Sequence, residues 1–159
     1  MNPIGLWLKC VGAVVLLSAP VVANGYDKEF TGYNSNEWSD PENWDSYGAP
    51  SWEDSVYIPY GKACVCAESE VEYRAESIFV EAGATLTIDG VTLGIGNQNL
   101  AVNTSAIDGE IRFIGENPVL LFVIQTDGRC ELDGSGTITA SVGNGYTPGT
   151  IIHWHSGEY

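Results

Sequence analysis

Residues 89–142 read DGVTLGIGNQNLAVNTSAI, then DGEIRFIGENPVLLFVIQT, then DGRCELDGSGTITASV, and this stretch decides the predicted fold. Each segment opens with Asp-Gly, and the pair recurs at a step of 19 residues, at Asp89, Asp108 and Asp127. A glycine follows each Asp by seven residues, and an aliphatic residue follows each by eleven, at Leu100, Val119 and Ile138. Such a repeat predicts successive coils of a β-solenoid, with glycine at the corners and a period-2 stripe pointing inward.

The composition after Asp54 is typical of an all-β chain. β-Branched residues are dense there, and no run of ten or more residues outside the N-terminal segment shows a helical period. Asp-Gly is also a favoured hairpin turn, so a β-sandwich or jelly roll is the alternative fold. Equal steps favour the solenoid, because each coil must return to the same lateral position after climbing one strand spacing. We therefore assign residues 62–159 to a single-stranded parallel β-solenoid, with 19-residue repeats at 89–145.

The N-terminal segment, residues 1–23, has the features of a secretory signal peptide. A short stretch with one positive charge, Lys9, precedes a mostly apolar run from Cys10 to Leu17, and Val21-Val22-Ala23 offers a cleavage site before Asn24. The apolar run is about half as long as the roughly 20 residues that a membrane-spanning helix needs. We therefore predict export, no membrane span in the mature chain, and a secreted or cell-surface location.

The chain is strongly acidic, with 21 acidic residues, six basic residues and a formal net charge of −15. A surface of that charge repels nucleic acid, whose binding depends on neutralising phosphates with Lys and Arg. Charged residues make up only 17% of the chain and hydrophobic ones 44%, which favours a folded core over disorder.

The acidity suits solubility outside the cell, and structural calcium is an alternative explanation. Candidate carboxylates are Glu37, Asp40, Glu42, Asp45, Glu53 and Asp54. No EF-hand spacing is present, and no other cofactor is predicted. The Asp of each Asp-Gly is expected to be a turn residue that bonds to its own backbone.

Three cysteines follow the predicted signal peptide, namely Cys64, Cys66 and Cys130. Export permits a disulfide, and one of the first two could pair with Cys130, but the sequence fixes no connectivity. In a strand, Cys64 and Cys66 point the same way, and C-x-C without a nearby His or Cys is a weak metal signal. A packed role for these thiols is the favoured interpretation.

Residues 24–61 differ in composition from the rest of the mature chain. Tryptophans and tyrosines alternate there with acidic and turn-forming residues, and neither a helical nor a strand period persists. A solenoid needs its end covered, because an open edge presents unpaired backbone groups and apolar side chains. We therefore predict that residues 24–61 form an ordered, loop-rich aromatic cap on the first coil.

The segment from Trp38 to Gly61 resembles the opening of secreted bacterial β-helix proteins. The matching residues are Trp38-Ser39-Asp40-Pro41-Glu42-Asn43-Trp44, then Pro50, then Asp54-Ser55-Val56-Tyr57-Ile58-Pro59, and then Gly61. These proteins include autotransporter-like and adhesin-type repeats and proteins sorted by PEP-CTERM-like signals. The resemblance implies a right-handed parallel β-helix with an N-terminal aromatic cap, displayed or released outside the cell.

Three tryptophans of the predicted cap, Trp38, Trp44 and Trp52, are candidates for a sugar-stacking platform. Aromatic faces stack on sugar C–H surfaces, and nearby carboxylates accept hydrogen bonds from hydroxyl groups. The competing and favoured interpretation is that these rings fill the small core of the cap.

The pair His153 and His155 is the candidate metal or acid/base site. In a strand two imidazoles at i and i+2 project to one side, and Glu158 is the nearest carboxylate in sequence that could complete a site. The favoured alternative is a terminal strand that packs through Trp154 on the last coil.

These patterns favour a secreted or cell-surface β-solenoid domain of structural or adhesive type, without catalytic activity. No serine-nucleophile motif, P-loop or dinucleotide fingerprint is present. The alternative function is a carbohydrate-binding or carbohydrate-active extracellular module. Under either hypothesis the expected partner is an extracellular glycan or a component of the cell surface or matrix.

Overall fold

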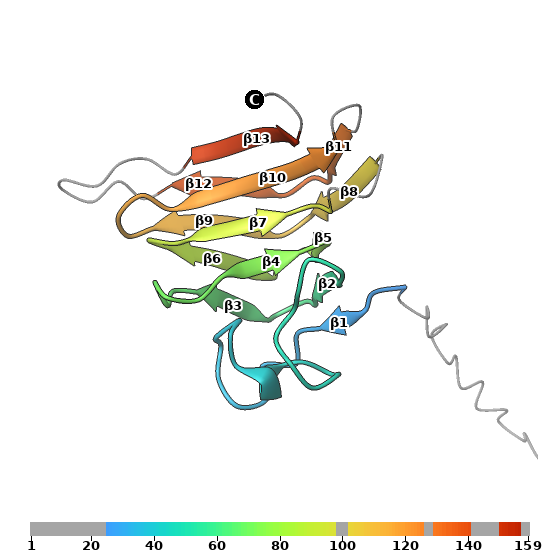
Figure 1. Ribbon diagram of the computed structural model, residues 1–159. Coiled ribbons are helices and arrows are strands. Elements are labelled where there is room, and N and C mark those ends of the chain that lie inside the picture. Colours follow the sequence, from blue (N-terminus) through green and yellow to red (C-terminus); the bar gives the residue numbers. More distant parts are fainter. Residues whose placement is uncertain (1–24, 98–101, 126–128, 141–149, 157–159) are drawn as a thin grey trace, which may run out of the picture.

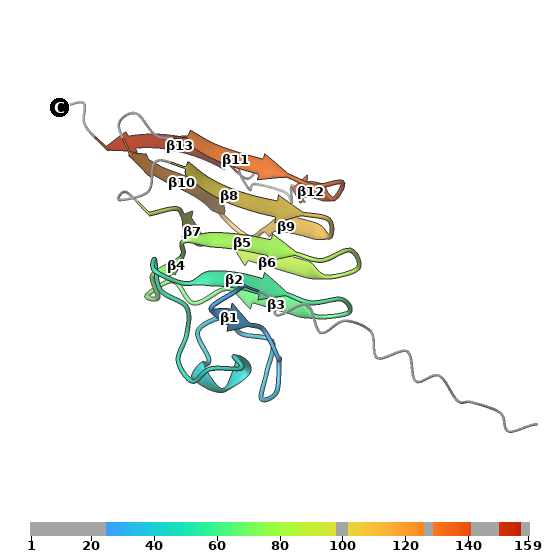
Figure 2. The same ribbon diagram turned by 90° about the vertical axis from the view of Figure 1, so that its right-hand side faces the viewer.

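The computed structural model describes residues 25–97, 102–125, 129–140 and 150–156, and nearly all of their regular structure is β-strand. The strands of these ranges pair in parallel and belong to three sheets that stack coil upon coil, so the predicted β-solenoid is confirmed (Figure 1). The chain makes about four turns, and the coil winds in the right-handed sense as it climbs from the cap (Figures 1 and 2).

Each full turn contributes one strand to each sheet, in the order sheet I, sheet II, sheet III. Sheet I contains β1 (Lys28–Glu29), β2 (Ser55–Ile58), β5 (Ser77–Val80), β8 (Val102–Ile107) and β11 (Arg129–Asp133). Sheet II contains β3 (Ala63–Cys66), β6 (Thr85–Asp89), β9 (Glu110–Ile114) and β12 (Thr137–Ala140). Sheet III contains β4 (Tyr73–Ala75), β7 (Thr92–Ile95), β10 (Val119–Gln125) and β13 (Thr150–Ser156).

The prediction that one repeat makes one coil is wrong, because stacked residues are further apart in sequence than the repeat step. Phe79 pairs with Ala106, and even in the shorter first turn Val56 pairs with Ile78. Asp89-Gly90 lies at the corner between sheets II and III, and Asp108-Gly109 lies at the corner between sheets I and II. The step from one Asp-Gly to the next therefore covers two of the three sides of a coil.

The predicted aliphatic stripe consequently does not form one column. Val119 begins β10 in sheet III and pairs with Thr92 and Thr150. Ile138 lies in sheet II above Ile111, and Leu100 falls outside the described residues. Ile138 is in the last coil and is 40% exposed, so it does not hold the stack in the predicted way.

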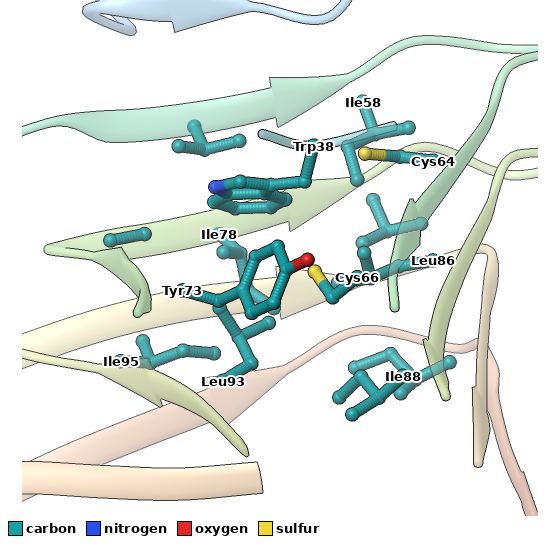
Figure 3. Packing of buried hydrophobic residues seen from close by; sticks show 14 of the residues in the cluster. Trp38, Ile58, Cys64, Cys66, Tyr73, Ile78, Leu86, Ile88, Leu93 and Ile95 are labelled. Atoms are coloured by element: carbon teal, nitrogen blue, oxygen red, sulfur yellow. The ribbon is translucent and has the colours of Figure 1, made fainter. Parts of the chain in front are cut away.

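The core consists of columns of inward side chains, one residue per coil. In sheet II, Cys64 packs under Leu86 and Leu86 under Ile111, and in sheet III Leu93 lies between Tyr73 and Leu120. All of these side chains are buried. Figure 3 shows Cys64, Leu86, Tyr73 and Leu93 among them. Burial of one such Leu or Ile side chain stabilises the fold by about 1.5–3 kcal/mol, so the columns are the main source of stability.

The segment before the first coil is the predicted cap, and it covers the lower edges of two sheets. β1 pairs in parallel with β2 beneath sheet I, while the Trp38 amide donates to the Val65 carbonyl oxygen (2.8 Å) beneath sheet II. The Val65 amide donates in turn to the Asn36 carbonyl oxygen (2.8 Å). The edge groups that could recruit another chain are thereby paired. Because the first coil starts at Ser55, residues 55–61 belong to the solenoid and not, as predicted, to the cap.

Asn43 organises the cap from its centre. It ends the 3-10 helix η1 (Pro41–Asn43) and is fully buried. Its side-chain oxygen accepts from the amides of Asn34 and Ser35 (2.9 Å each), and its Nδ2 donates to the Ser35 hydroxyl and the Glu37 carbonyl (2.8 Å each). All the hydrogen-bonding capacity of this buried amide is used, which fixes the loop around it.

The corner between sheets I and II is a ladder of backbone groups. The amide of Glu110 donates to the Ala84 carbonyl (3.0 Å), and the amide of Thr137 donates to the Gly109 carbonyl (2.9 Å). A Cβ at Gly109 would collide with the carbonyl oxygens of Ala84 and Glu81, so only glycine fits there.

Candidate functional site

Two of the three predicted sugar-stacking tryptophans are buried. Trp38 and Trp44 pack edge to face with ring centroids 5.1 Å apart, and Phe30 joins them at 5.2 Å from Trp44. The Trp44 Nε1 donates to the Trp38 carbonyl oxygen (2.9 Å). Trp38 packs against the first coil from the cap side, close to Ile58 and Cys64 (Figure 3). These rings fill the core of the cap, as the favoured interpretation predicts.

Trp52 differs from the other two because 47% of its surface is exposed. It belongs to the loop that leads from the cap into β2, and its side chain reaches Arg74 of β4, with the guanidinium carbon 5.6 Å from the ring centroid. The three tryptophans therefore form no shared platform, and Trp52 alone is placed to meet a ligand.

A groove of about 480 Å³ lies beside Trp52, on the outer face of sheet III. Its wall and floor come from the loop before β4 and from outward positions of β4, β7 and β10, because inward and outward side chains alternate along each strand. The lining includes Trp52, Val71, Glu72, Arg74, Val91, Thr92, Gly94 and Leu121. A second hollow of about 410 Å³ adjoins Trp52 and is lined by Pro50, Ser51, Trp52, Glu72 and Arg74.

The register of sheet III explains how the groove arises. Arg74 pairs with Gly94, and Gly94 pairs with Leu121, so these three residues form one outward column. A Cβ at Gly94 would have its nearest neighbour, the Tyr73 carbonyl oxygen, 3.8 Å away, so the missing side chain leaves a real gap. The gap lies between the longer side chains of Arg74 and Leu121.

The charged side chains of the groove lining form one ion pair. Arg74 contacts the Glu72 carboxylate through Nη2, and the two side chains are 42% and 77% exposed. The Arg74 fork donates hydrogen bonds in one plane, and the Glu72 carboxylate accepts them. A flat indole, a planar donor and an acceptor are thus within reach of one small molecule.

The candidate calcium carboxylates act as local acceptors in the cap. Asp40 accepts from the amide of Glu42 (3.0 Å), Asp45 from the amide of Glu29 (2.9 Å), and Asp54 from the amide of Ser51 (2.7 Å). Within the described ranges no group of three or more His, Cys, Asp or Glu side chains could hold a metal ion. Of the remaining candidates, Glu42 and Glu53 lie on the exposed surface of the cap.

Glu37 is the carboxylate with the least favourable surroundings. Its Oε2 is buried and has no hydrogen-bond partner. Burial, reinforced by the charges of Glu68 and Asp89, raises its pKa above the ordinary glutamate value. The charged form of Glu37 therefore destabilises the folded protein. The side chain borders a hollow of about 500 Å³ between the cap and the first coil.

Asp108 belongs to the coil ladder and has the opposite shift. Its Oδ1 accepts from both the amide and the hydroxyl of Ser135 (2.9 Å each), one coil further on. These bonds lower the pKa of Asp108. The expectation that each Asp of Asp-Gly bonds to its own turn is therefore wrong at Asp108, which joins two coils.

The histidine pair lies in β13. The register places His153 beside Phe122 and His155 beside Ile124, and the side chains of the pair lie outside the described residues. Glu158 is also outside the described residues.

The cysteines are too far apart for the disulfide that the sequence left open. Cys64 and Cys66 are free and buried in the first coil of sheet II, and burial raises their pKa values well above the ordinary thiol value. Cys130 is in the last coil of sheet I, three strand spacings further along the axis. That separation is about 14 Å, whereas disulfide-bonded Cα atoms lie within about 7 Å of each other.

Comparisons with protein-family models, with curated proteins and with solved structures found no match to this chain. The described part of the chain also has no helix with the length and apolar character needed to cross a bilayer.

Sequence reasoning identified Trp52 but missed Glu72, Arg74 and Gly94. The alternation in Glu72-Tyr73-Arg74-Ala75 indicates an outward Arg74, but only the pairing of β4 with β7 places Gly94 next to it. Without that register no pattern in the sequence brings the three residues together.

Proposed function

We propose that this chain is an extracellular β-solenoid domain of structural or adhesive type, without catalytic activity, exported by the signal in residues 1–23. The observation that carries the proposal is the closed N-terminal end. β1 and the Glu37–Val65 bridge pair with the edges of the first coil, and the buried aromatic cluster fills its opening. A rod capped in this way is protected from edge-to-edge pairing at this end of sheets I and II, and its outer faces remain available to its surroundings.

The charge distribution supports a role outside the cell. The formal net charge of −15 keeps such rods apart in solution, and the carboxylates of the cap and corners serve as hydrogen-bond acceptors that fix loops. The resemblance of residues 38–61 to secreted bacterial β-helix proteins points in the same direction. A surface-displayed or released rod is the arrangement that these features favour.

Export is tested with a fusion of residues 1–30 to a reporter that is active only outside the cytoplasm. We expect activity in the exported fraction, and N-terminal sequencing should find a mature chain that begins at Asn24. A reporter that stays inactive in the cytoplasm with its N-terminus uncut would refute the extracellular part of the proposal.

Adhesion is tested by coating beads with the protein and measuring their attachment to surfaces that carry cell-wall polysaccharides, host-cell glycans or matrix proteins. We expect retention on at least one surface, saturable by soluble protein. Retention no higher than that of beads coated with an unrelated acidic protein would refute an adhesive role and leave a purely structural one.

Carbohydrate recognition is the second candidate function, and it is compatible with the first because an adhesive surface needs a ligand. The observation that favours it is the exposed Trp52 beside the groove on sheet III.

A further inference from the structure

We propose that the groove beside Trp52 binds a neutral oligosaccharide, with a sugar ring stacked on the Trp52 indole and hydroxyl groups bonded to Arg74 and Glu72. This inference names a ligand class for the adhesive surface and so rests on the proposed function.

The position of the Trp52 indole suits an extended ligand. Trp52 lines both adjoining hollows, of about 480 and 410 Å³, and Glu72 and Arg74 also line both. Volumes of that size fall in the range of about 300–1,000 Å³ that small-molecule sites occupy. The indole therefore borders two neighbouring hollows with shared lining residues, where consecutive units of an oligosaccharide can lie.

Trp52 is held in place while it remains exposed. The Arg74 guanidinium lies 5.6 Å from the ring centroid, a cation–π contact that orients the indole before any ligand arrives. A pre-oriented ring loses little freedom on binding, so its stacking contributes more fully to affinity. The equatorial C–H groups of a pyranose ring supply the apolar face that an indole accepts.

The charges in and around the groove favour a neutral ligand. Arg74 is the cation of the groove lining and it already contacts Glu72. An anionic sugar would have to displace Glu72 and approach a chain of net charge −15. A cationic ligand would meet Arg74. Sugar hydroxyls instead accept from the guanidinium and donate to the carboxylate, and leave the ion pair in place.

The floor of the groove is open at Gly94. Gly94 is flanked by Arg74 and Leu121 in the same column, and the absence of a side chain there lets a flat ring approach the sheet. Leu121 adds an apolar contact on the far side. A longer side chain at position 94 would fill this space without touching the core, because Gly94 is at an outward position between the buried Leu93 and Ile95.

The test measures binding of the secreted protein to neutral hexasaccharides built from glucose, mannose, galactose or N-acetylglucosamine. Hexagalacturonate and a proline-rich peptide are the comparison ligands, and titration calorimetry with indole fluorescence gives the dissociation constants. We expect at least one neutral hexasaccharide to bind at least tenfold more tightly than hexagalacturonate and the peptide. Tighter binding of hexagalacturonate or of the peptide, or no binding of any hexasaccharide, overturns the proposal.

Four variants locate the site. Trp52→Ala should weaken binding at least tenfold, Trp52→Phe should retain part of the affinity, and Gly94→Leu should block the groove floor. Tyr33→Ala removes another exposed aromatic ring of the cap, 85% exposed and outside the groove lining, and should leave binding unchanged. Melting temperatures establish that each variant is folded, and Gly94→Leu decides the matter if Trp52→Ala fails to fold. Unchanged affinity in a folded Trp52→Ala or Gly94→Leu protein overturns the proposal.

The two proposals fail separately. Beads that attach to a surface equally well with wild-type and Trp52→Ala protein would refute the groove and keep adhesion. Hexasaccharide binding that depends on Trp52, without attachment of beads to any surface, would refute adhesion and keep the groove.

Discussion

Replacing Asn43 with alanine should destabilise the protein by about 3 kcal/mol, at about 1 kcal/mol for each of three backbone groups that lose a partner. The substitution removes four hydrogen bonds at the centre of the cap, two accepted from the Asn34 and Ser35 amides and two donated to the Ser35 hydroxyl and the Glu37 carbonyl. A buried polar group left without a partner costs about 1–3 kcal/mol. The lower end of that range applies because Asn34, Ser35 and Glu37 are only partly shielded from water.

Urea denaturation followed with two spectroscopic probes measures this loss of stability. Indole fluorescence follows the cap, where Trp38 and Trp44 are buried, and far-UV circular dichroism follows the sheets. With an m-value of about 2 kcal/mol/M, the loss lowers the fluorescence midpoint by about 1.5 M. The circular dichroism midpoint should fall less if the coils outlast the cap, since solenoid stability is a sum of units and their interfaces.

The matched control is Asn36→Ala, because Asn36 is exposed and only its carbonyl oxygen joins the cap to Val65. Its free energy of unfolding should lie within about 0.5 kcal/mol of wild type, as for most surface substitutions. If Asn43→Ala is as stable as Asn36→Ala, Asn43 does not hold the cap together and the account of the cap is refuted.

Three further substitutions, the first with a matched control, test the corner at Gly109 and the carboxylates of Asp108 and Glu37. Gly109→Ala places a methyl group against backbone carbonyls and should lower the free energy of unfolding by about 1–3 kcal/mol. Gly94→Ala should leave stability unchanged, because the nearest atom to the new Cβ would be 3.8 Å away. Equal urea midpoints for the two variants would contradict the corner ladder. Asp108→Asn should lower the melting temperature at pH 7, because a lowered folded-state pKa stabilises the fold above the unfolded value near 3.8. The difference from wild type should shrink as the pH falls below that value, and a difference independent of pH would refute the carboxylate's role. Glu37→Gln should act in the opposite direction, because a raised folded-state pKa means that the folded protein disfavours the charged carboxylate. The variant should melt at a higher temperature than wild type at pH 7, and this gain should vanish below pH 4.5. A lower melting temperature at pH 7 would show that the carboxylate has a partner.

The class of fold was predictable because it depends on composition and short-range pattern. Strand-forming residues, glycine corners and the absence of helical periods are properties of neighbouring residues, and they led to parallel coils with an aromatic cap. The length of a coil is different, because it depends on loops. Tyr73 pairs with Leu93 around a short turn, whereas Val119 pairs with Thr150 around a much longer one, since the connections between sheets vary from turn to turn. The equal steps between the Asp-Gly pairs therefore connect corners that lie between different pairs of sheets, and they do not mark successive coils.

Which tryptophans are buried and which one is exposed could not be predicted from the sequence, for a related reason. Trp38, Trp44 and Trp52 all occur among acidic and turn-forming residues in one loop-rich segment. Trp38 and Trp44 are buried because the loop closed by Asn43 folds them under the first coil, and Trp52 is exposed because its loop passes over the outer face of sheet III. Burial here is decided by which surface each loop meets, and that is a tertiary property.

The residues that carry the sequence resemblance stabilise the cap. Trp38 and Trp44 form its core, Asp40 caps the 3-10 helix at the Glu42 amide, and Asn43 fills its centre. A motif made of such residues specifies how a solenoid begins and carries no information about a ligand. The residues that line the groove, by contrast, are not among the matched residues of the motif. They lie in the loop around Trp52, in the loop before β4 and at outward positions of β4, β7 and β10. A protein that shares the motif should therefore share the cap, while its ligand depends on what stands at the positions of Trp52, Arg74 and Gly94.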